Sequence, residues 1–133
     1  MFQFYKSLSG QSFPTTETLP TTASETYTEG EGLVVTNGTL TKTAATVPPT
    51  YMAIKSYVAP ATGMLPLPVE PVLPHFVYKT TFAADASANA EGTLVTIHTD
   101  GATITATATS GVATITKKLG TGAVDTEALV RFI

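Results

Sequence analysis

His75 and His98 are the only histidines of this 133-residue chain, and they are the side chains best suited to proton transfer near neutral pH. A hydrolytic site needs such a base beside a nucleophile and an orienting group. His98 lies in a run of alternating threonine and apolar residues, and His75 begins a second alternating run, so both are expected to be strand residues. Neither has a second histidine at the spacing of a zinc-binding pair. We therefore predict that the chain is not an enzyme and holds no metal.

Two pairs of acidic residues are spaced so that both carboxylates would lie on one side of an extended strand: Glu29 with Glu31, and Asp125 with Glu127. Such pairs serve acid-base catalysis or bind calcium, but solvated turns around glycines carry acids as well. The motif Gly120-x-Gly122 lacks the third glycine and the following helix of a dinucleotide-binding loop. The sequence therefore predicts turns at these positions and no cofactor.

Composition excludes further classes of protein. The chain has no cysteine, which excludes disulfides, thiolate zinc sites and cysteine nucleophiles. Seven scattered basic residues stand against ten acidic ones, for a net charge of −3, so we expect no nucleic-acid partner. No apolar run approaches the roughly 20 residues of a membrane span, and the first residues do not resemble a secretory signal. We expect a protein made in a cytoplasm, with no membrane partner.

Charged residues are scarce in this chain. They make up 13% of it, about half the usual fraction of roughly 25%, and threonine and alanine take their place. A polar but uncharged surface suits a protein that is packed against neighbours. A solvated, threonine-rich β-sheet has the same composition, so both interpretations stay open.

Alternating residues between positions 94 and 117 predict a β-meander. The dipeptides Asp100-Gly101 and Ser110-Gly111 separate runs in which threonine alternates with apolar residues. Asp-Gly favours a two-residue type I′ hairpin turn, because both turn residues need a positive φ. Two-residue turns at both sites fix the register, with the predicted pairs Ile97–Ile104 and Ala106–Ile115. One face of the meander is then apolar, and the other carries threonines.

Other segments predict further strands. Asn37-Gly38 indicates a second hairpin, within residues 33–42. Alternating patterns indicate three more strands, over residues 51–58, 75–80 and 127–133. Residues 60–74 contain five prolines, so we expect an extended loop or an edge strand there and not a central strand. A short connection with at most one helical turn is expected over residues 83–90. The predicted fold class is all-β, a small antiparallel β-barrel or β-sandwich with a hairpin meander.

Residues 1–28 are predicted to form an extended N-terminal arm, followed by a single β domain over residues 29–133. The arm is rich in threonine, serine and proline with isolated aromatic residues, so it cannot bury enough apolar area by itself to offset its ordering entropy. Either its own domain or a neighbouring molecule must therefore hold it. In an alternative interpretation, the first strand of the sheet begins near Phe2.

Two features have the chemistry of binding surfaces. Threonines at 103, 105, 107 and 109 form a row of methyl and hydroxyl groups such as a sugar-facing sheet would use, although solvent-facing strands also favour threonine. Pro68-x-x-Pro71 and Pro71-x-x-Pro74 match the minimal polyproline ligand. Because no basic residue flanks them, we interpret this segment as a stiff apolar loop that docks on a neighbouring subunit at low entropic cost.

One pattern of turns and hydrophobic residues extends over about residues 27–133. It consists of Glu29 to Val35, a glycine turn, Thr39 to Lys42, Pro49 to Ala53, His75 to Thr80, the Thr99-Asp100-Gly101 turn and Leu129 to Phe132. This pattern resembles the capsid decoration proteins, also called cement proteins, of tailed bacteriophages. It contains no catalytic motif, and the first 26 residues lie outside it.

The resemblance implies a β-barrel or β-sandwich that binds the outer surface of an expanded phage head, bridges adjacent major capsid protein subunits and stabilises the capsid. The expected location is the virion, and the expected assembly is a homo-oligomer, a trimer in preference to a dimer. No contact residue carries over from the family. From the sequence itself we predict the partner-binding residues Phe2, Phe4, Tyr5, Phe13, Leu65, Leu67 and Val69. The alternative function is that of a carbohydrate-binding β-module of a virion fibre or tip.

Overall fold

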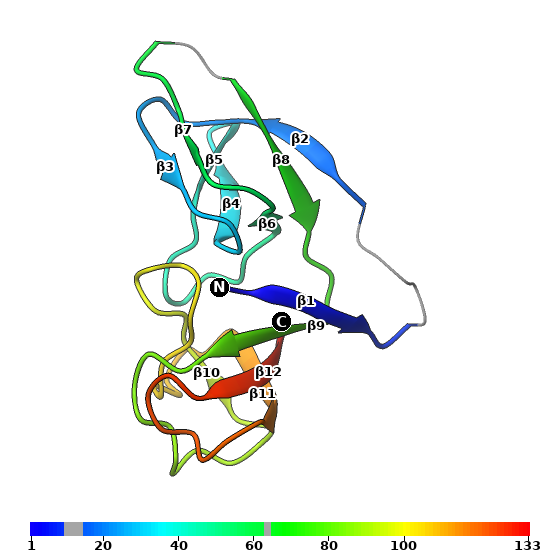
Figure 1. Cartoon of the computed structure of the whole chain (residues 1–133), viewed down its shortest axis with the longest axis vertical. Coiled ribbons are helices and arrows are strands. Elements are labelled where there is room, and N and C mark those ends of the chain that lie inside the picture. Colours follow the sequence, from blue (N-terminus) through cyan, green and yellow to red (C-terminus); the bar gives the residue numbers. More distant parts are fainter. Residues whose placement is uncertain (10–14, 63–64) are drawn as a thin grey trace.

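Two five-stranded antiparallel sheets and a two-stranded ribbon make up the molecule (Figure 1). The computed structural model describes residues 1–9, 15–62 and 65–133, and every regular element in these ranges is a strand. The prediction of an all-β fold is confirmed. The sheets are open and do not close into a barrel, so the sandwich-like alternative describes the fold. No helix of a length and hydropathy that would cross a bilayer occurs in these ranges.

Sheet A has the strand order β1-β9-β12-β11-β10. Its strands are β1 (Gln3–Ser7), β9 (Phe76–Thr81), β12 (Glu127–Phe132), β11 (Ala113–Lys118) and β10 (Leu94–Val95). Alternate residues of β11 point to the core, so Ala113 and Ile115 are buried while the threonines between them are half-buried. The predicted closing strand at the end of the chain is confirmed as β12.

Sheet B has the strand order β2-β8-β6-β4-β5, and a separate ribbon pairs β3 with β7. The strands of sheet B are β2 (Glu17–Pro20), β8 (Pro66–Pro71), β6 (Tyr51–Ala53), β4 (Gly32–Thr36) and β5 (Thr39–Lys42); those of the ribbon are β3 (Thr26–Tyr27) and β7 (Tyr57–Val58). The predicted Asn37-Gly38 hairpin is confirmed. Thr36 pairs with Thr39, and both turn residues have positive φ, 51° at Asn37 and 83° at Gly38.

Each sheet buries its own hydrophobic cluster. Core A lies under sheet A and includes Phe76, Tyr78, Ile97, Ile115 and Phe132. Core B lies under sheet B and includes Tyr27, Leu33, Leu40, Leu67 and Val69. In Figure 1, sheet B forms the upper half of the molecule and sheet A the lower half, with both chain termini between them.

Direct contacts join the two halves. The Phe2 amide donates to the Gly30 carbonyl at 2.8 Å, and the Gly32 amide donates to the Gly101 carbonyl at 2.7 Å. Met52 belongs to sheet B, yet its buried side chain packs in core A. The two sheets are therefore fixed relative to one another by main-chain hydrogen bonds and shared packing.

The meander prediction is right for its first turn and wrong for its second. Ile97 pairs with Ile104, and Gly101 has φ of 70°, as the Asp-Gly turn predicts. The predicted Ala106–Ile115 pairing is absent, because β11 instead lies between β10 and β12, with Val95 opposite Ala113. Gly111 allows this path, since a Cβ there would lie 2.5 Å from the carbonyl carbon of Leu94. The predicted burial of Val95, Ile97, Ile104 and Ile115 is nevertheless confirmed.

The proline-rich segment is not an edge strand or a loop, because β8 lies between β2 and β6. The register explains how prolines are tolerated there. Strand β2 pairs with residues 66–69 of β8, whereas β6 pairs with residues 69–71, so only Val69 is paired on both sides. Pro66 and Pro68 each have one paired side, and a missing amide on the other side breaks no ladder hydrogen bond.

Two further predictions are corrected. The strand expected over residues 51–58 is divided into β6, in sheet B, and β7, in the ribbon, because the chain bends between them. The connection over residues 83–90 contains no helical turn and closes instead with a turn in which the Asn89 amide donates to the Ala86 carbonyl at 3.0 Å.

The first 28 residues contribute strands to the sheets of the domain. β1 pairs with β9, β2 with β8 and β3 with β7, and each partner comes from a later part of the chain. Tyr27 is buried in core B, and its hydroxyl donates to the Leu40 carbonyl at 2.7 Å. The alternative interpretation, in which the first strand begins near Phe2, describes this structure, and the described part of the segment is held by its own domain.

Candidate functional site

The residues predicted to contact a partner differ widely in exposure. Phe2, Leu67 and Val69 are buried, with exposed fractions of 3%, 0% and 0%. Phe4 is half-buried, whereas Tyr5 and Leu65 are each 54% exposed. Phe13 lies outside the described residues. Of the predicted set, Tyr5 and Leu65 are thus the side chains that a partner can reach most directly in this conformation.

The buried members of the set serve the two cores. The Phe2 ring meets the Phe132 ring edge to face, with 5.1 Å between the ring centroids. Leu67 and Val69 alternate along β8 and pack in core B, because every second residue of a strand points to the same face. Their prediction as contact residues assumed a loop, and the strand conformation of β8 removes them from the surface.

Tyr5 is exposed because of a β-bulge in β1. Phe4 pairs with Tyr78 and Lys6 pairs with Val77, so Tyr5 is an extra residue without a partner in β9. A bulge bends an edge strand and turns one side chain out of the regular alternation. Phe4 keeps its place toward the core, with ring centroids 5.2 Å from Phe76. Tyr5 therefore projects from the open edge of sheet A.

Leu65 directly precedes β8, at the opposite end of sheet B from β1 (Figure 1). Its carbonyl accepts hydrogen bonds from the Thr21 hydroxyl at 2.6 Å and the Thr21 amide at 3.3 Å. Its backbone is therefore fixed while its side chain points to solvent. Tyr5 and Leu65 thus lie on separate parts of the molecule and form two contact points rather than one patch.

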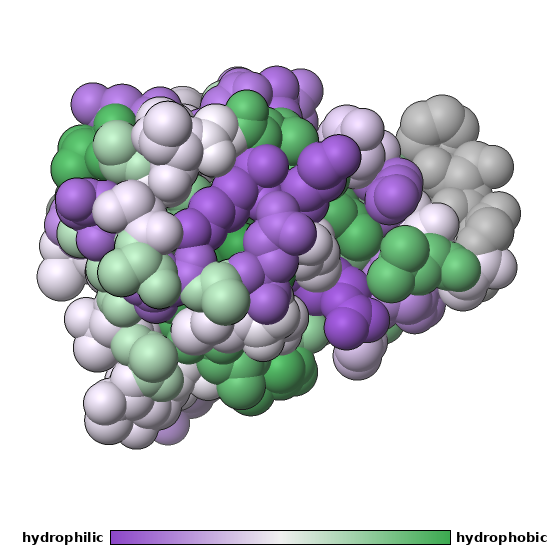
Figure 2. Space-filling model, turned by 90° about the horizontal axis from the view of Figure 1, so that it is seen from below, coloured by the Kyte–Doolittle hydropathy of each residue, from purple (hydrophilic) through white to green (hydrophobic). Residues whose placement is uncertain are grey.

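The end of the molecule formed by sheet A shows apolar residues in several separate groups with polar residues between them (Figure 2). Leu119 and Val124, from the connection between β11 and β12, are exposed to 45% and 50%. Scattered exposed apolar residues of this kind are normal on a protein surface. This end therefore offers no reason to add contact residues to the predicted set.

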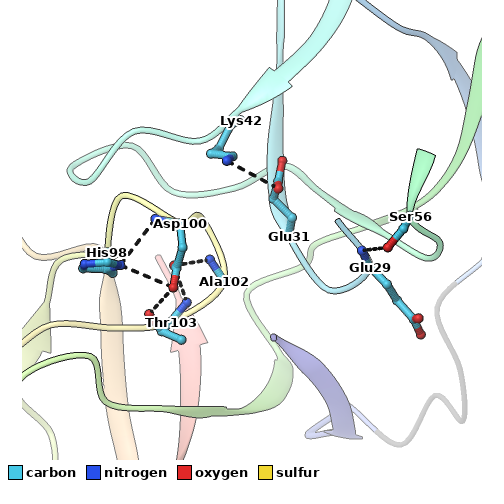
Figure 3. A network of polar contacts seen from close by, with 8 residues as sticks. All are labelled: Glu29, Glu31, Lys42, Ser56, His98, Asp100, Ala102 and Thr103. Atoms are coloured by element: carbon cyan, nitrogen blue, oxygen red, sulfur yellow. Dashed lines mark hydrogen bonds and ion pairs between the residues drawn. The ribbon is translucent and has the colours of Figure 1, made fainter. Parts of the chain in front are cut away.

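The two histidines occupy different environments. His98 lies in the Asp100 turn, with its Nδ1 atom 3.3 Å from an oxygen of the Asp100 carboxylate (Figure 3). The Thr103 hydroxyl donates to Asp100 at 2.8 Å, not to the histidine. His75 is half-buried with its ring against Phe76. A nucleophile-base pair would need a hydroxyl on a histidine, and these contacts do not provide one.

Asp100 organises its own turn. Its Oδ1 atom accepts from the amides of Ala102 and Thr103, at 2.8 and 2.9 Å (Figure 3). Burial by itself raises the pKa of Asp100, but these hydrogen bonds and the contacts from Thr103 and His98 hold it below the ordinary value of 3.8. The carboxylate thus stabilises the loop that carries Gly101 into contact with sheet B.

Glu31 is a buried carboxylate that the sequence interpretation treated as a solvated turn residue. Its side chain is 1% exposed, and neither oxygen has a hydrogen-bond partner among the described residues. The Lys42 ammonium lies 3.6 Å away, and the Lys42 side chain is 37% exposed. Burial raises the pKa of Glu31, and Lys42 offsets only part of this effect. Gly101 covers this pair from the side of sheet A.

Gly101→Ala is expected to lower the free energy of unfolding by about 2 kcal/mol, because positive φ strains an alanine and its Cβ meets the ion pair. That Cβ would lie 2.9 Å from Cγ of Lys42 and 3.1 Å from Cγ of Glu31. Gly38→Ala is the matched control, since Gly38 has a similar φ of 83° and no described atom within 4 Å of the added Cβ. Urea unfolding of both variants measures the difference. Equal losses would contradict a close contact at Gly101.

No group of three or more histidine, aspartate and glutamate side chains that could hold a metal ion occurs in ranges 1–9, 15–62 and 65–133. A cavity of about 290 Å³ lies between the two sheets, with Glu70 and Tyr78 in its wall. The sequence interpretation missed it. The one available signal was the position of Glu70, which alternates with the apolar residues of a proline-rich strand.

Comparisons with known proteins add no family. No protein-family model, no curated protein and no solved structure matches this chain.

Proposed function

We propose that the chain is a structural decoration protein of a tailed-bacteriophage head, located on the outer capsid surface, where it bridges adjacent major capsid protein subunits and stabilises them without catalysis. The pattern of turns and hydrophobic residues over residues 27–133 carries this proposal. The all-β fold, the charged fraction of only 13% and the net charge of −3 support it, because they suit a protein packed against other proteins.

The positions of the exposed contact residues suit a bridging role. Tyr5 projects from the edge of sheet A, and Leu65 lies at the far end of sheet B. Both have backbones fixed by strand pairing or hydrogen bonds, so docking costs little additional conformational entropy. A molecule with two separate anchors can contact two subunits at once. We propose a homotrimer, with a dimer as the alternative assembly.

Head binding by single-residue variants is the direct test of this proposal. Tyr5→Ala and Leu65→Ala are each expected to weaken co-sedimentation with expanded heads prepared without the protein by about tenfold, because buried aromatic and aliphatic anchors dominate interface energies. Leu119→Ala, which removes a side chain of similar exposure at the sheet A end, is expected to change binding by less than about twofold. All three proteins should keep the stability of the original chain.

Absence of head binding by the unchanged protein would contradict the proposal, and saturable sugar binding would favour the carbohydrate-binding alternative. Single substitutions are preferable to removal of the first 26 residues. That truncation deletes β1 and β2 and leaves only Tyr27 of β3. Loss of binding after truncation would therefore report loss of folding as well as loss of contact.

A further inference from the structure

The cavity between the sheets has an acidic and partly apolar wall. Its volume of about 290 Å³ is close to the lower limit of roughly 300 Å³ for small-ligand pockets, so it suits one long side chain better than a larger ligand. Residues from both halves line it, including Gln3 and Phe4 of β1, Met52 of β6 and Tyr78 of β9. Gln3 is exposed, which places one side of the cavity at the molecular surface.

Glu70 extends into this region because of the alternation in β8. Leu67 and Val69 point into core B, so Glu70 points to the opposite face of sheet B. It pairs with Met52, whose side chain packs in core A, and directly opposite residues of an antiparallel pair share one face. The Glu70 carboxylate therefore faces sheet A, where burial raises its pKa.

Tyr78 brings a second polar group to the same wall. The residue is 1% exposed, and its hydroxyl has no hydrogen-bond partner among the described residues. Burial raises the pKa of this hydroxyl, and the charge of Glu70 raises it further, so the two groups lie near one another. A buried hydroxyl without a partner destabilises the fold relative to phenylalanine. Its presence here indicates a partner supplied from outside the chain.

The charged side chains in the lining are both acidic, Glu29 and Glu70. The ion pairs of the described residues involve other carboxylates, namely those of Glu31, Asp100 and Glu127. Negative charge without a counterion favours a cation, and a buried position favours one that carries its own apolar stem. Lysine and arginine side chains combine both properties.

We propose that this cavity receives a lysine or arginine side chain of the capsid partner, with its cationic head donating hydrogen bonds to the Glu70 carboxylate and the Tyr78 hydroxyl. Its methylene stem packs against Phe4 and Met52. The identity of the partner rests on the proposed function, whereas the chemistry of the cavity rests on the geometry alone. The cavity opens beside β1, the strand that carries Tyr5, so both contacts fit one docking surface.

The cavity is tested by titrating the full chain with n-butylammonium and n-butylguanidinium and following amide chemical shifts. Saturable shifts around Glu70 and Tyr78 are expected for at least one cation, and not for the neutral n-butanol. Glu70→Gln is expected to weaken binding about tenfold and Tyr78→Phe by about threefold. Glu17→Gln, an exposed carboxylate on β2, and Tyr57→Phe, outside the cavity, are matched controls that should leave the affinity unchanged.

Folding and binding effects are separable in this experiment. Tyr78→Phe is expected to melt at or above the temperature of the original protein, so its weaker binding cannot come from unfolding. Equal binding of n-butanol, or unchanged affinity in Glu70→Gln, would overturn the proposal. Equal head binding by Glu70→Gln and the original chain would overturn it too, while the decoration function stands. No head binding by the original chain would overturn the decoration function and this choice of partner.

Discussion

Phe2→Ala is expected to lower the free energy of unfolding by about 3 kcal/mol, at the lower end of the range for truncating a buried phenylalanine. Phe2 is 3% exposed and packs edge to face on Phe132, and its amide donates to Gly30. Its removal leaves a cavity in core A and loosens the junction between the two sheets. Some relaxation is expected because β1 is an edge strand. Urea unfolding followed by tyrosine fluorescence measures the effect.

Tyr5→Ala is the matched control for this prediction. It removes an aromatic ring from the same strand, but one that is 54% exposed, so we expect a change within about 0.5 kcal/mol. A small and equal effect of both substitutions would mean that β1 is not docked on its own domain in solution. The first residues would then behave as an arm that is held by a neighbouring molecule.

Lys42→Met is expected to destabilise the protein by about 2–3 kcal/mol at pH 7, because it removes the countercharge of the buried Glu31 carboxylate. Protonation of Glu31 limits the loss. Keeping a carboxyl of ordinary pKa 4.5 neutral at pH 7 costs about 3.4 kcal/mol, or roughly 1.4 kcal/mol per pH unit. The loss should therefore shrink as the pH falls and nearly disappear close to the ordinary pKa. Urea unfolding at pH 7.5, 6 and 5 measures this trend.

The direction of this pH dependence follows from the raised pKa of Glu31 in the folded state. The folded protein holds the proton more tightly than the unfolded chain, so the contribution of Glu31 to stability is full below pH 4.5 and is lost as the pH rises through the raised pKa. Lys42→Met widens that window. In a Glu31→Gln background the substitution is expected to cost less than about 1 kcal/mol at every pH.

Lys79→Met provides the comparison for a surface ion pair. Lys79 is 35% exposed, much like Lys42, but its partner Glu127 is 50% exposed and 3.2 Å away. Such a pair contributes about 0–1 kcal/mol. An equal loss for Lys42→Met and Lys79→Met, or a Lys42→Met loss that is the same at pH 5 and pH 7.5, would contradict a charged and desolvated Glu31.

Local signals in the sequence determined the strands and several turns. Asn37-Gly38 and Asp100-Gly101 set their turns because the two-residue loop needs positive φ, which glycine adopts without strain. Alternation along the chain identified the buried face of Ile97, Ile104 and Ile115, because side chains of a strand point to opposite faces in turn. These signals depend on neighbours in the chain and therefore survive in any tertiary arrangement.

Pairing partners, by contrast, depended on the tertiary structure. The Ser110-Gly111 turn resembles a hairpin, yet β11 pairs with β10 and β12, where Gly111 packs on the backbone of Leu94. The prolines of β8 suggested an edge or a loop, but β2 and β6 cover different parts of that strand. No local pattern contains this information, because it lies in the overlap of strands that are distant in sequence.

The candidate site shows the same division. Composition and alternation by themselves determined an all-β, weakly charged, cysteine-free chain, and they selected Tyr5 and Leu65 among several apolar residues. Only the tertiary structure separated these exposed side chains from the buried Phe2, Leu67 and Val69, since exposure depends on the bulge opposite β9 and on the core beneath β8. It also brought Glu70 and Tyr78 into one cavity, because that contact joins two sheets whose relative position is set by packing and not by the local chain.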